Sequence, residues 1–464
     1  MRVWKLSWWK VALLGSTIAL LGWVSWRYAD QRRPTLVALN TQTGKLQWVH
    51  ALTADAGYSK GPIAGDGKVL LGFCRETAEQ RCGAYQLQAF DAQSGKLLWS
   101  DRPAGRYDPY EIASNQSALL QDNQLYLQLE EELRSLDPAT GKQRWAIPRR
   151  WFFAPAGVWH GMGFISHSDA VAIINLDGKQ QQLQTLDPKT GKLLQQTKRS
   201  FDKLTATQNL IAANDRTLFL ETSGLVPADV PNTFFDSGTS IVTAYDRKTL
   251  KPRFRTTIQG NISHLQVAGE TLQIRTASQY DGQKQTIVTG KVLAVSTTSG
   301  QILWQKNRAQ LGCREDGYSW RVDADTVYLN CDRNGRVRYK SQESKIVALP
   351  AQTGQVKWQT QISPDRYSYN LPNAVSAQQY FTFRLVGTAD KRQTQAIALD
   401  RQTGKLLWAF SLFDPEAKYV DTFQSVVAAE GDRFFFLDSL SRWQLWLLQI
   451  NRNWYLKQPL SVSS

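Results

Sequence analysis

The feature that most constrains this chain is one short sequence pattern that recurs eight times. In each copy an apolar strand ends in Asp or a substitute, the turn position follows four residues later, and usually a Trp stands four residues after that. The copies are Leu36–Trp48, Leu87–Trp99, Leu133–Trp145, Leu183–Gln195, Val242–Phe254, Val292–Trp304, Ile346–Trp358 and Ala396–Trp408. The seven steps from Gly44 to Gly404 give a mean period of roughly 51 residues, a size typical of propellers and solenoids.

The chemistry of the pattern indicates a tight turn between two strands. An Asp side chain accepts hydrogen bonds from backbone N–H groups about two residues further on, and Gly supplies the positive φ that other residues resist. The motif turns carry Gly44, Gly95, Gly141, Gly191, Gly300, Gly354 and Gly404, and Leu250 takes this place in the fifth copy. We therefore expect each copy to be a strand–turn–strand unit.

Other strand-like runs, such as Lys68–Phe73 and Thr326–Cys331, lie between the copies. Each period then supplies about four short antiparallel strands, which is the content of one propeller blade. The sequence predicts an all-β, eight-bladed β-propeller of four-stranded antiparallel blades over residues 34–464. The first copy has no inner strands before it, whereas 424–458 contains spare ones, so we expect the N- and C-terminal strands to pair and close the ring.

These repeats resemble those of the pyrroloquinoline-quinone (PQQ) dehydrogenases and their non-enzymatic relatives. The relatives include the propeller lipoprotein of the outer-membrane β-barrel assembly machinery. The resemblance implies that the motif tryptophans dock each blade onto the next, a role that falls to Trp48, Trp99, Trp145, Trp304, Trp358 and Trp408. Gln195, Phe254 and Leu250 depart from the pattern, so looser docking is expected at the fourth and fifth blades.

Residues 1–33 form a segment of a different kind. Val11–Trp26 carries no charge, and counting from Leu6 gives about the 20 residues that a spanning helix needs. We expect one N-terminal transmembrane helix acting as a signal anchor, with the propeller on the exported, periplasmic or extracytoplasmic, side. A removed signal peptide is the alternative. Orientation stays open because three cationic residues flank the segment on each side.

We expect no catalytic, cofactor or metal residues. The four histidines show no zinc spacing, and no nucleophile or phosphate-binding motif occurs. The alternative is a PQQ-dependent quinoprotein dehydrogenase or another propeller enzyme. The resemblance implies adjacent cysteines in such dehydrogenases, and no two cysteines are adjacent here.

Topology separates the two faces of the predicted ring. The links between blades and the loops between the second and third strands of a blade share one face, and the motif turns share the other. Most links combine a cation with an aromatic ring, residue types enriched at binding hot spots. The candidate partner face consists of Arg106, Tyr107, Tyr110, Arg149, Arg150, Trp151, Arg366, Tyr367 and Tyr369. Alternatively, these tyrosines pack between blades while the cations are solvated.

The four cysteines fall at the same face. Cys74 and Cys82 flank one loop, whereas Cys313 lies in a link and Cys331 ends a strand. We expect the pairs 74–82 and 313–331 to fall within the Cα separation that a disulfide needs, and these two disulfides would imply an oxidising compartment. Buried thiols are the alternative.

Composition narrows the partner. Lys and Arg number 55 against 40 Asp and Glu, a net charge of +15 that favours anionic partners. We expect a membrane-tethered scaffold that binds a protein or an anionic envelope polymer, and the resemblance implies envelope protein assembly. Nucleic acid is not expected on the exported side. The oligomeric state is left open.

Overall fold

The computed structural model describes the strands of the ring and most of the turns between them. The described residues are 32–52, 56–75, 84–101, 118–128, 132–148, 164–167, 169–177, 180–200, 211–223, 239–277, 279–281, 286–288, 290–307, 309–313, 320–331, 344–363, 373–388, 391–412 and 427–441. The expected transmembrane segment lies outside these residues. Within them, no helix has the length and apolar character needed to cross a membrane.

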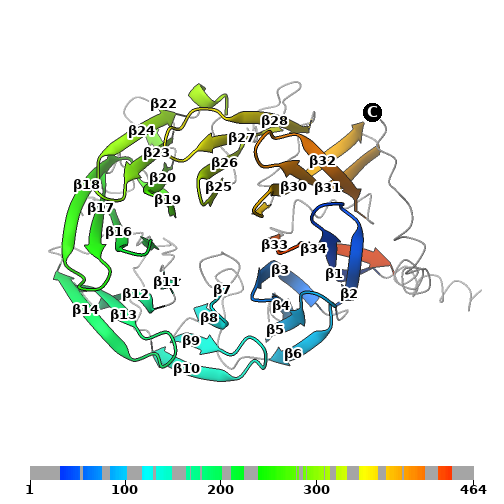
Figure 1. Cartoon of the computed structure of the whole chain (residues 1–464), viewed down its shortest axis with the longest axis horizontal. Coiled ribbons are helices and arrows are strands. Elements are labelled where there is room, and N and C mark those ends of the chain that lie inside the picture. The colour runs from blue at the N-terminus through cyan, green and yellow to red at the C-terminus, as the bar shows by residue number, and fades with distance from the viewer. Residues whose placement is uncertain are drawn as a thin grey trace, which may run out of the picture.

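Eight four-stranded antiparallel sheets stand around a central axis like the blades of a propeller (Figure 1). We number the blades by the motif copy that each contains. Blade 1 comprises β33 (Ala428–Glu430), β34 (Arg433–Ser441), β1 (Arg32–Asn40) and β2 (Leu46–Ala51). Blade 2 comprises β3 (Ala56–Gly65), β4 (Lys68–Arg75), β5 (Ala84–Asp91) and β6 (Leu97–Asp101). Blade 3 comprises β7 (Ala118–Gln121), β8 (Gln124–Gln128), β9 (Glu132–Leu136) and β10 (Gln143–Pro148). Blade 4 comprises β11 (Phe164–His167), β12 (Ala170–Asp177), β13 (Gln180–Leu186) and β14 (Leu193–Ser200).

The second half of the ring repeats this order from the inner strand to the outer strand. Blade 5 comprises β15 (Ile211–Ala213), β16 (Thr217–Ser223), β17 (Thr239–Asp246) and β18 (Pro252–Gln259). Blade 6 comprises β19 (Ile262–Ala268), β20 (Thr271–Thr276), β23 (Lys291–Ser296) and β24 (Ile302–Asn307), with a hairpin of β21 (Gln279–Asp281) and β22 (Thr286–Val288). Blade 7 comprises β25 (Trp320–Asp323), β26 (Thr326–Cys331), β27 (Ser344–Pro350) and β28 (Trp358–Ser363). Blade 8 comprises β29 (Ala374–Val375), β30 (Gln379–Thr388), β31 (Lys391–Asp400) and β32 (Leu406–Ser411). A 3₁₀ turn, η1 (Ala309–Leu311), lies between β24 of blade 6 and β25 of blade 7. The predicted eight-bladed all-β propeller is confirmed.

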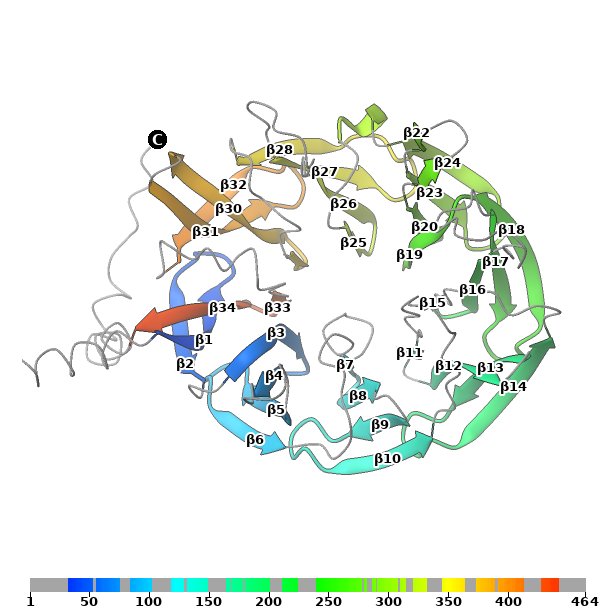
Figure 2. The same cartoon turned by 180° about the vertical axis from the view of Figure 1, so that it is seen from behind.

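The two ends of the described chain meet in blade 1. Strand β1 pairs with β34 along its whole length, from Arg32 opposite Ser441 to Asn40 opposite Arg433. The two strands lie side by side in both views of the ring (Figures 1 and 2). This pairing gives blade 1 its inner strands from one end of the chain and its outer strands from the other. It also covers the edges that β1 and β34 would otherwise leave open where the ring closes.

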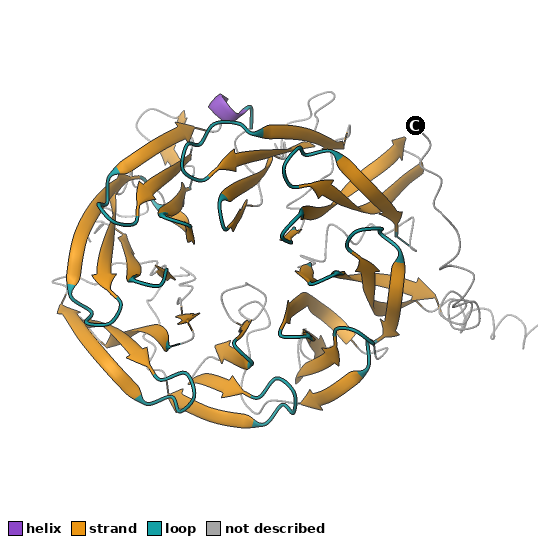
Figure 3. Cartoon of the chain, viewed as in Figure 1, coloured by secondary structure: helices purple, strands orange, loops and turns teal. Residues whose placement is uncertain are grey.

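Each motif turn joins the third strand of a blade to its outer strand (Figure 3). In blade 2 the Asp91 carboxylate accepts from the N–H of Ser94 at 2.7 Å, and the Gly95 N–H donates to the Asp91 carbonyl at 2.9 Å. In seven of the eight blades the register then shifts by one residue just before the aromatic position. Such a β-bulge re-aims the next side chain. Where the side chain at this position is Trp or Phe, its ring lies against the neighbouring blade.

The hydrophobic core consists of a series of layers, each between two adjacent blades. The layer between blades 8 and 1 is rich in phenylalanine: Phe381 and Phe434 stack with ring centroids 4.8 Å apart, and Phe383 packs edge-on against Phe436. Between blades 7 and 8, Tyr328 lies against Tyr380 with a centroid separation of 4.8 Å. Every blade therefore shares one apolar layer with each of its neighbours.

Candidate interaction surfaces

At six of the eight junctions a motif tryptophan links one blade to the next through a backbone carbonyl. Each indole N–H donates to the residue that follows the motif Asp, or its substitute, in the next blade. Trp48 donates to Ala92 at 3.1 Å, Trp99 to Pro138 at 2.9 Å, Trp145 to Pro188 at 2.8 Å, Trp304 to Ala351 at 2.8 Å, Trp358 to Arg401 at 3.0 Å, and Trp408 to Thr41. A large apolar ring is thus anchored by its one polar atom.

The glycine of each motif turn lies directly against the aromatic ring of the preceding blade. A Cβ added to Gly95 would lie 2.6 Å from Trp48, and one added to Gly141 would lie 2.8 Å from Trp99. Real Cβ atoms do not approach other heavy atoms this closely. Glycine is therefore required at this position for two reasons. The backbone has a positive φ, 69° at Gly95, and the indole occupies the space where a Cβ atom would lie.

The junction between blades 4 and 5 lacks this clamp, and two departures from the motif meet there. Gln195 takes the place of the Trp in blade 4, and Leu250 takes the place of the facing Gly in blade 5. Leu250 adopts a φ of 51°, and its side chain is buried with Leu183, Leu218 and other apolar residues. With no indole to make room for, a leucine side chain occupies the junction instead.

An ion pair adds a second link at this junction. Arg247, beside Leu250, pairs with Asp169 in the turn between β11 and β12, and its guanidinium also donates to the Asn214 carbonyl at 3.2 Å. The arginine thus joins the inner turns of blades 4 and 5. Between blades 5 and 6, Phe254 takes the place of the Trp and lies against Gly300.

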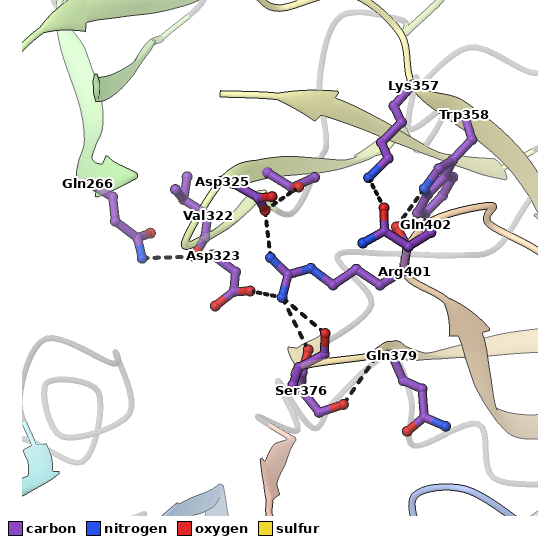
Figure 4. Close-up of polar contacts among 12 residues, drawn as sticks. Gln266, Val322, Asp323, Asp325, Lys357, Trp358, Ser376, Gln379, Arg401 and Gln402 are labelled. Carbon is purple, nitrogen blue, oxygen red and sulfur yellow. Dashed lines mark hydrogen bonds and ion pairs between the residues drawn. The ribbon is translucent and has the colours of Figure 1, made fainter. Parts of the chain in front are cut away.

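Arg401 occupies the equivalent position in blade 8 and pairs with two acids of blade 7 (Figure 4). Its guanidinium pairs with Asp323 at 2.7 Å and with Asp325 at 2.7 Å, both in the inner turn of blade 7. It also reaches the Ser376 carbonyl of its own blade at 3.5 Å. Burial acts against the charge, but the Thr326 hydroxyl and Arg401 hold the pKa of Asp325 below its ordinary value.

The other shifted ionisable groups in the described residues also have structural causes. Hydrogen bonds within the motif turns lower the pKa of Asp91, Asp137, Asp187, Asp246 and Asp400, and Arg144 makes the largest contribution at Asp137. Burial lowers the pKa of His264 to about 4 and raises that of Tyr328 to about 12. These groups hold turns or fill core layers. Nowhere in the described ranges do three metal-ligating side chains gather.

The face opposite the motif turns carries a disulfide. Cys313, after η1, is bonded to Cys331 at the end of β26, with their Cα atoms 4.9 Å apart. Both residues are buried in the layer between blades 6 and 7. Cys74 lies in β4, whereas Cys82 falls outside the described residues. All nine members of the candidate partner face also fall outside them, so that face remains a prediction.

Sequence reasoning did not find Arg247 and Arg401. Both follow a motif Asp directly, and no other copy has a cation there. A cation at this position in only two of the eight copies is the sequence feature that could have indicated them. Their acidic partners lie at the inner turn of the preceding blade, and because most inner turns carry an acid, the sequence does not indicate which acid an arginine contacts.

Comparison with known proteins assigns the family. The model of the family described as outer membrane protein assembly factor BamB matches residues 2–150 and 179–382. The chain belongs to this family. No curated protein matches the sequence.

Several solved structures are similar to this ring. BamB from Moraxella catarrhalis is 14% identical, covers 74% of this chain and 87% of its own, and gives a TM-score of 0.47. Quinohemoprotein alcohol dehydrogenase ADHIIG from Pseudomonas putida HK5 is 13% identical, and the match covers 89% of this chain and 72% of the dehydrogenase with a TM-score of 0.45. Apo AztD from Citrobacter koseri is 11% identical, and the match covers 82% of this chain and 95% of AztD with a TM-score of 0.47.

Proposed function

We propose that this BamB-family propeller is a membrane-tethered scaffold on the exported side of its membrane. Its link face binds a protein or an anionic envelope polymer in the course of envelope protein assembly. The family assignment supports the role in assembly. The disulfide between Cys313 and Cys331 supports an oxidising compartment, because such bonds persist outside the cytosol.

The observation that carries this proposal is the different use of the two faces. On the motif-turn face, six blades repeat the same indole-to-carbonyl contact, and the turn acids hold their own turns. This repetition produces rigidity and leaves little to distinguish one blade from another. The links differ in sequence from blade to blade. Loops that vary on a rigid support are the usual place for specific binding.

Four alanine substitutions test the proposal. Arg106, Tyr107, Arg366 and Tyr367 are replaced together in the full-length chain. We expect capture of the partner to fall by at least about tenfold, because each hot-spot side chain contributes roughly 1–2 kcal/mol. The measurement is chemical crosslinking in membranes followed by mass spectrometry.

A matched control replaces four exposed lysines of the motif turns with alanine, namely Lys45, Lys96, Lys142 and Lys405. The control removes four positive charges from the opposite face, two more than the link-face variant loses, and should still capture the partner normally. Both variants should keep the circular dichroism spectrum and melting temperature of a folded ring. Undiminished capture by the link-face variant would rule out that face. Saturable binding in a spectroscopic titration with PQQ and calcium would favour the enzymatic alternative.

A further inference from the structure

The outer strand of blade 4, β14, is the most exposed outer strand in the described part of the ring. From Leu193 to Lys198 every side chain is exposed except that of Thr197, which is half-buried. Leu193 and Leu194 are 53% and 51% exposed. The outer strands of the other seven blades each turn a Trp or Phe toward the next blade. Strand β14 has Gln195 in that place. Its side chains therefore contribute little to holding the ring together.

The space beside β14 is filled only near the core. Leu250 and its apolar neighbours occupy the inner part of the junction between blades 4 and 5, and Arg247 pairs with Asp169 at the inner turns. Toward the outer rim, Gln195 and Arg255 are both exposed. In the other junctions the aromatic ring closes this space. At this junction Gln195 stands in place of that ring, and its side chain is exposed.

Strand β14 also has a free backbone edge. Among the described residues it is the last strand of its sheet and pairs with β13 alone. It is eight residues long, as β18 is, whereas the other outer strands have five or six. A free edge of this length presents unpaired N–H and C=O groups that favour an added extended strand. It contains no proline, which would remove a backbone donor, and its Lys198 would repel a basic strand and attract an acidic one.

The charge around β14 selects the kind of strand that fits. Exposed cations lie on this strand, on the neighbouring outer strand and in their motif turns: Lys189, Lys192, Lys198, Lys248, Lys251 and Arg255. The two acids in the same turns, Asp187 and Asp246, accept hydrogen bonds from their own turns. The region is therefore positive, with two exposed leucines beside it.

We propose that β14 receives an acidic extended segment of a partner protein, which joins the sheet of blade 4 as a fifth strand. Its backbone pairs with the free edge of β14, its carboxylates contact the surrounding lysines and Arg255, and its apolar side chains cover Leu193 and Leu194. This surface lies on the outer rim and is separate from the link face.

The test uses the full-length chain and a ten-residue peptide of alternating Val and Glu, with a Val and Lys peptide as the control. Hydrogen–deuterium exchange is followed at 193–200 and at 406–411 in β32, a strand that has the same Leu pair and an intact clamp. We expect the acidic peptide to slow exchange in β14 by about tenfold or more, to leave β32 unchanged, and to lose affinity in salt. Equal protection of both strands, or none, would overturn the proposal.

Two variants separate strand addition from general charge attraction. Lys192→Glu with Lys198→Glu should weaken binding by about tenfold or more, whereas Lys405→Glu near β32 should not. Gln195→Trp with Leu250→Gly rebuilds the missing clamp and should reduce binding without changing the net charge. If this second variant does not fold, as judged by circular dichroism, the charge reversal decides alone. Unchanged affinity in the charge-reversed protein would contradict the proposal.

Discussion

At the scale of single residues, the motif glycines show how one position can meet two requirements. Gly95 and Gly431 both adopt positive φ, at 69° and 56°. An added Cβ at Gly95 would lie 2.6 Å from Trp48, whereas one at Gly431 would meet nothing within 4 Å. The first glycine is needed for conformation and for space, and the second for conformation alone. The chain therefore contains its own control.

This difference predicts unequal effects of the same substitution. Gly431→Ala should lower the free energy of unfolding by roughly 1 kcal/mol, the usual effect of positive φ in a non-glycine residue. Gly95→Ala should cost about 1–3 kcal/mol more, because the indole of Trp48 must shift in a packed layer. Urea denaturation followed by tryptophan fluorescence measures both. Equal losses would show that the close approach of Trp48 is unimportant.

At the scale of elements, the motif turns predict how stability depends on pH. Hydrogen bonds in the folded turn lower the pKa of the five motif aspartates below their unfolded value of about 3.9. A lowered folded-state pKa stabilises the fold above the unfolded pKa, and this contribution is lost as pH falls through the folded pKa. The turns should therefore weaken in acid.

Replacing the five aspartates with asparagine should reduce this acid sensitivity. Blade 1 already uses Asn40, whose side-chain oxygen accepts from Gln42 at 3.1 Å and Thr43 at 2.9 Å, so the turn itself should survive. Between about pH 5 and about pH 3, the variant should lose less unfolding free energy than the original protein. The measurement is urea unfolding at each pH. A slope as steep as the original would mean that other carboxyls govern acid unfolding.

The elements also show which features could be predicted from sequence. The motif turns and blade count could be, because each turn is encoded within a few consecutive residues. The ion pair of Arg401 with Asp323 could not, because the partners belong to different blades and acids are common near the inner turns of most blades. The replacement of Trp by Gln195 and of Gly by Leu250 at one junction could be predicted only in part. Both departures are visible in sequence, but their link depends on knowing that each indole faces the glycine of the next blade.

At the scale of the whole molecule, the closure of the ring determines where the N-terminal segment leaves it. Strand β1 runs from Arg32 to Asn40 and ends at the motif turn, so it enters the ring from the link face. The residues between Trp26 and Arg32 span at most about 18 Å when fully extended. If 11–26 is anchored in a bilayer, as we propose, the link face is the one turned toward the membrane.

This orientation predicts unequal distances from the two faces to the bilayer. A fluorophore at Gln361, toward the link-face end of β28, should transfer energy to an acceptor on lipid headgroups more efficiently than one at Gln93 in a motif turn. The short connection to the anchor is the physical reason. The measurement uses the full-length chain in vesicles. Stronger transfer from Gln93 would reverse the orientation, and weak transfer from both positions would contradict the tether. A link face close to the bilayer would place its cations near anionic headgroups and near membrane-embedded partners, whereas β14 on the outer rim would remain open to soluble ones.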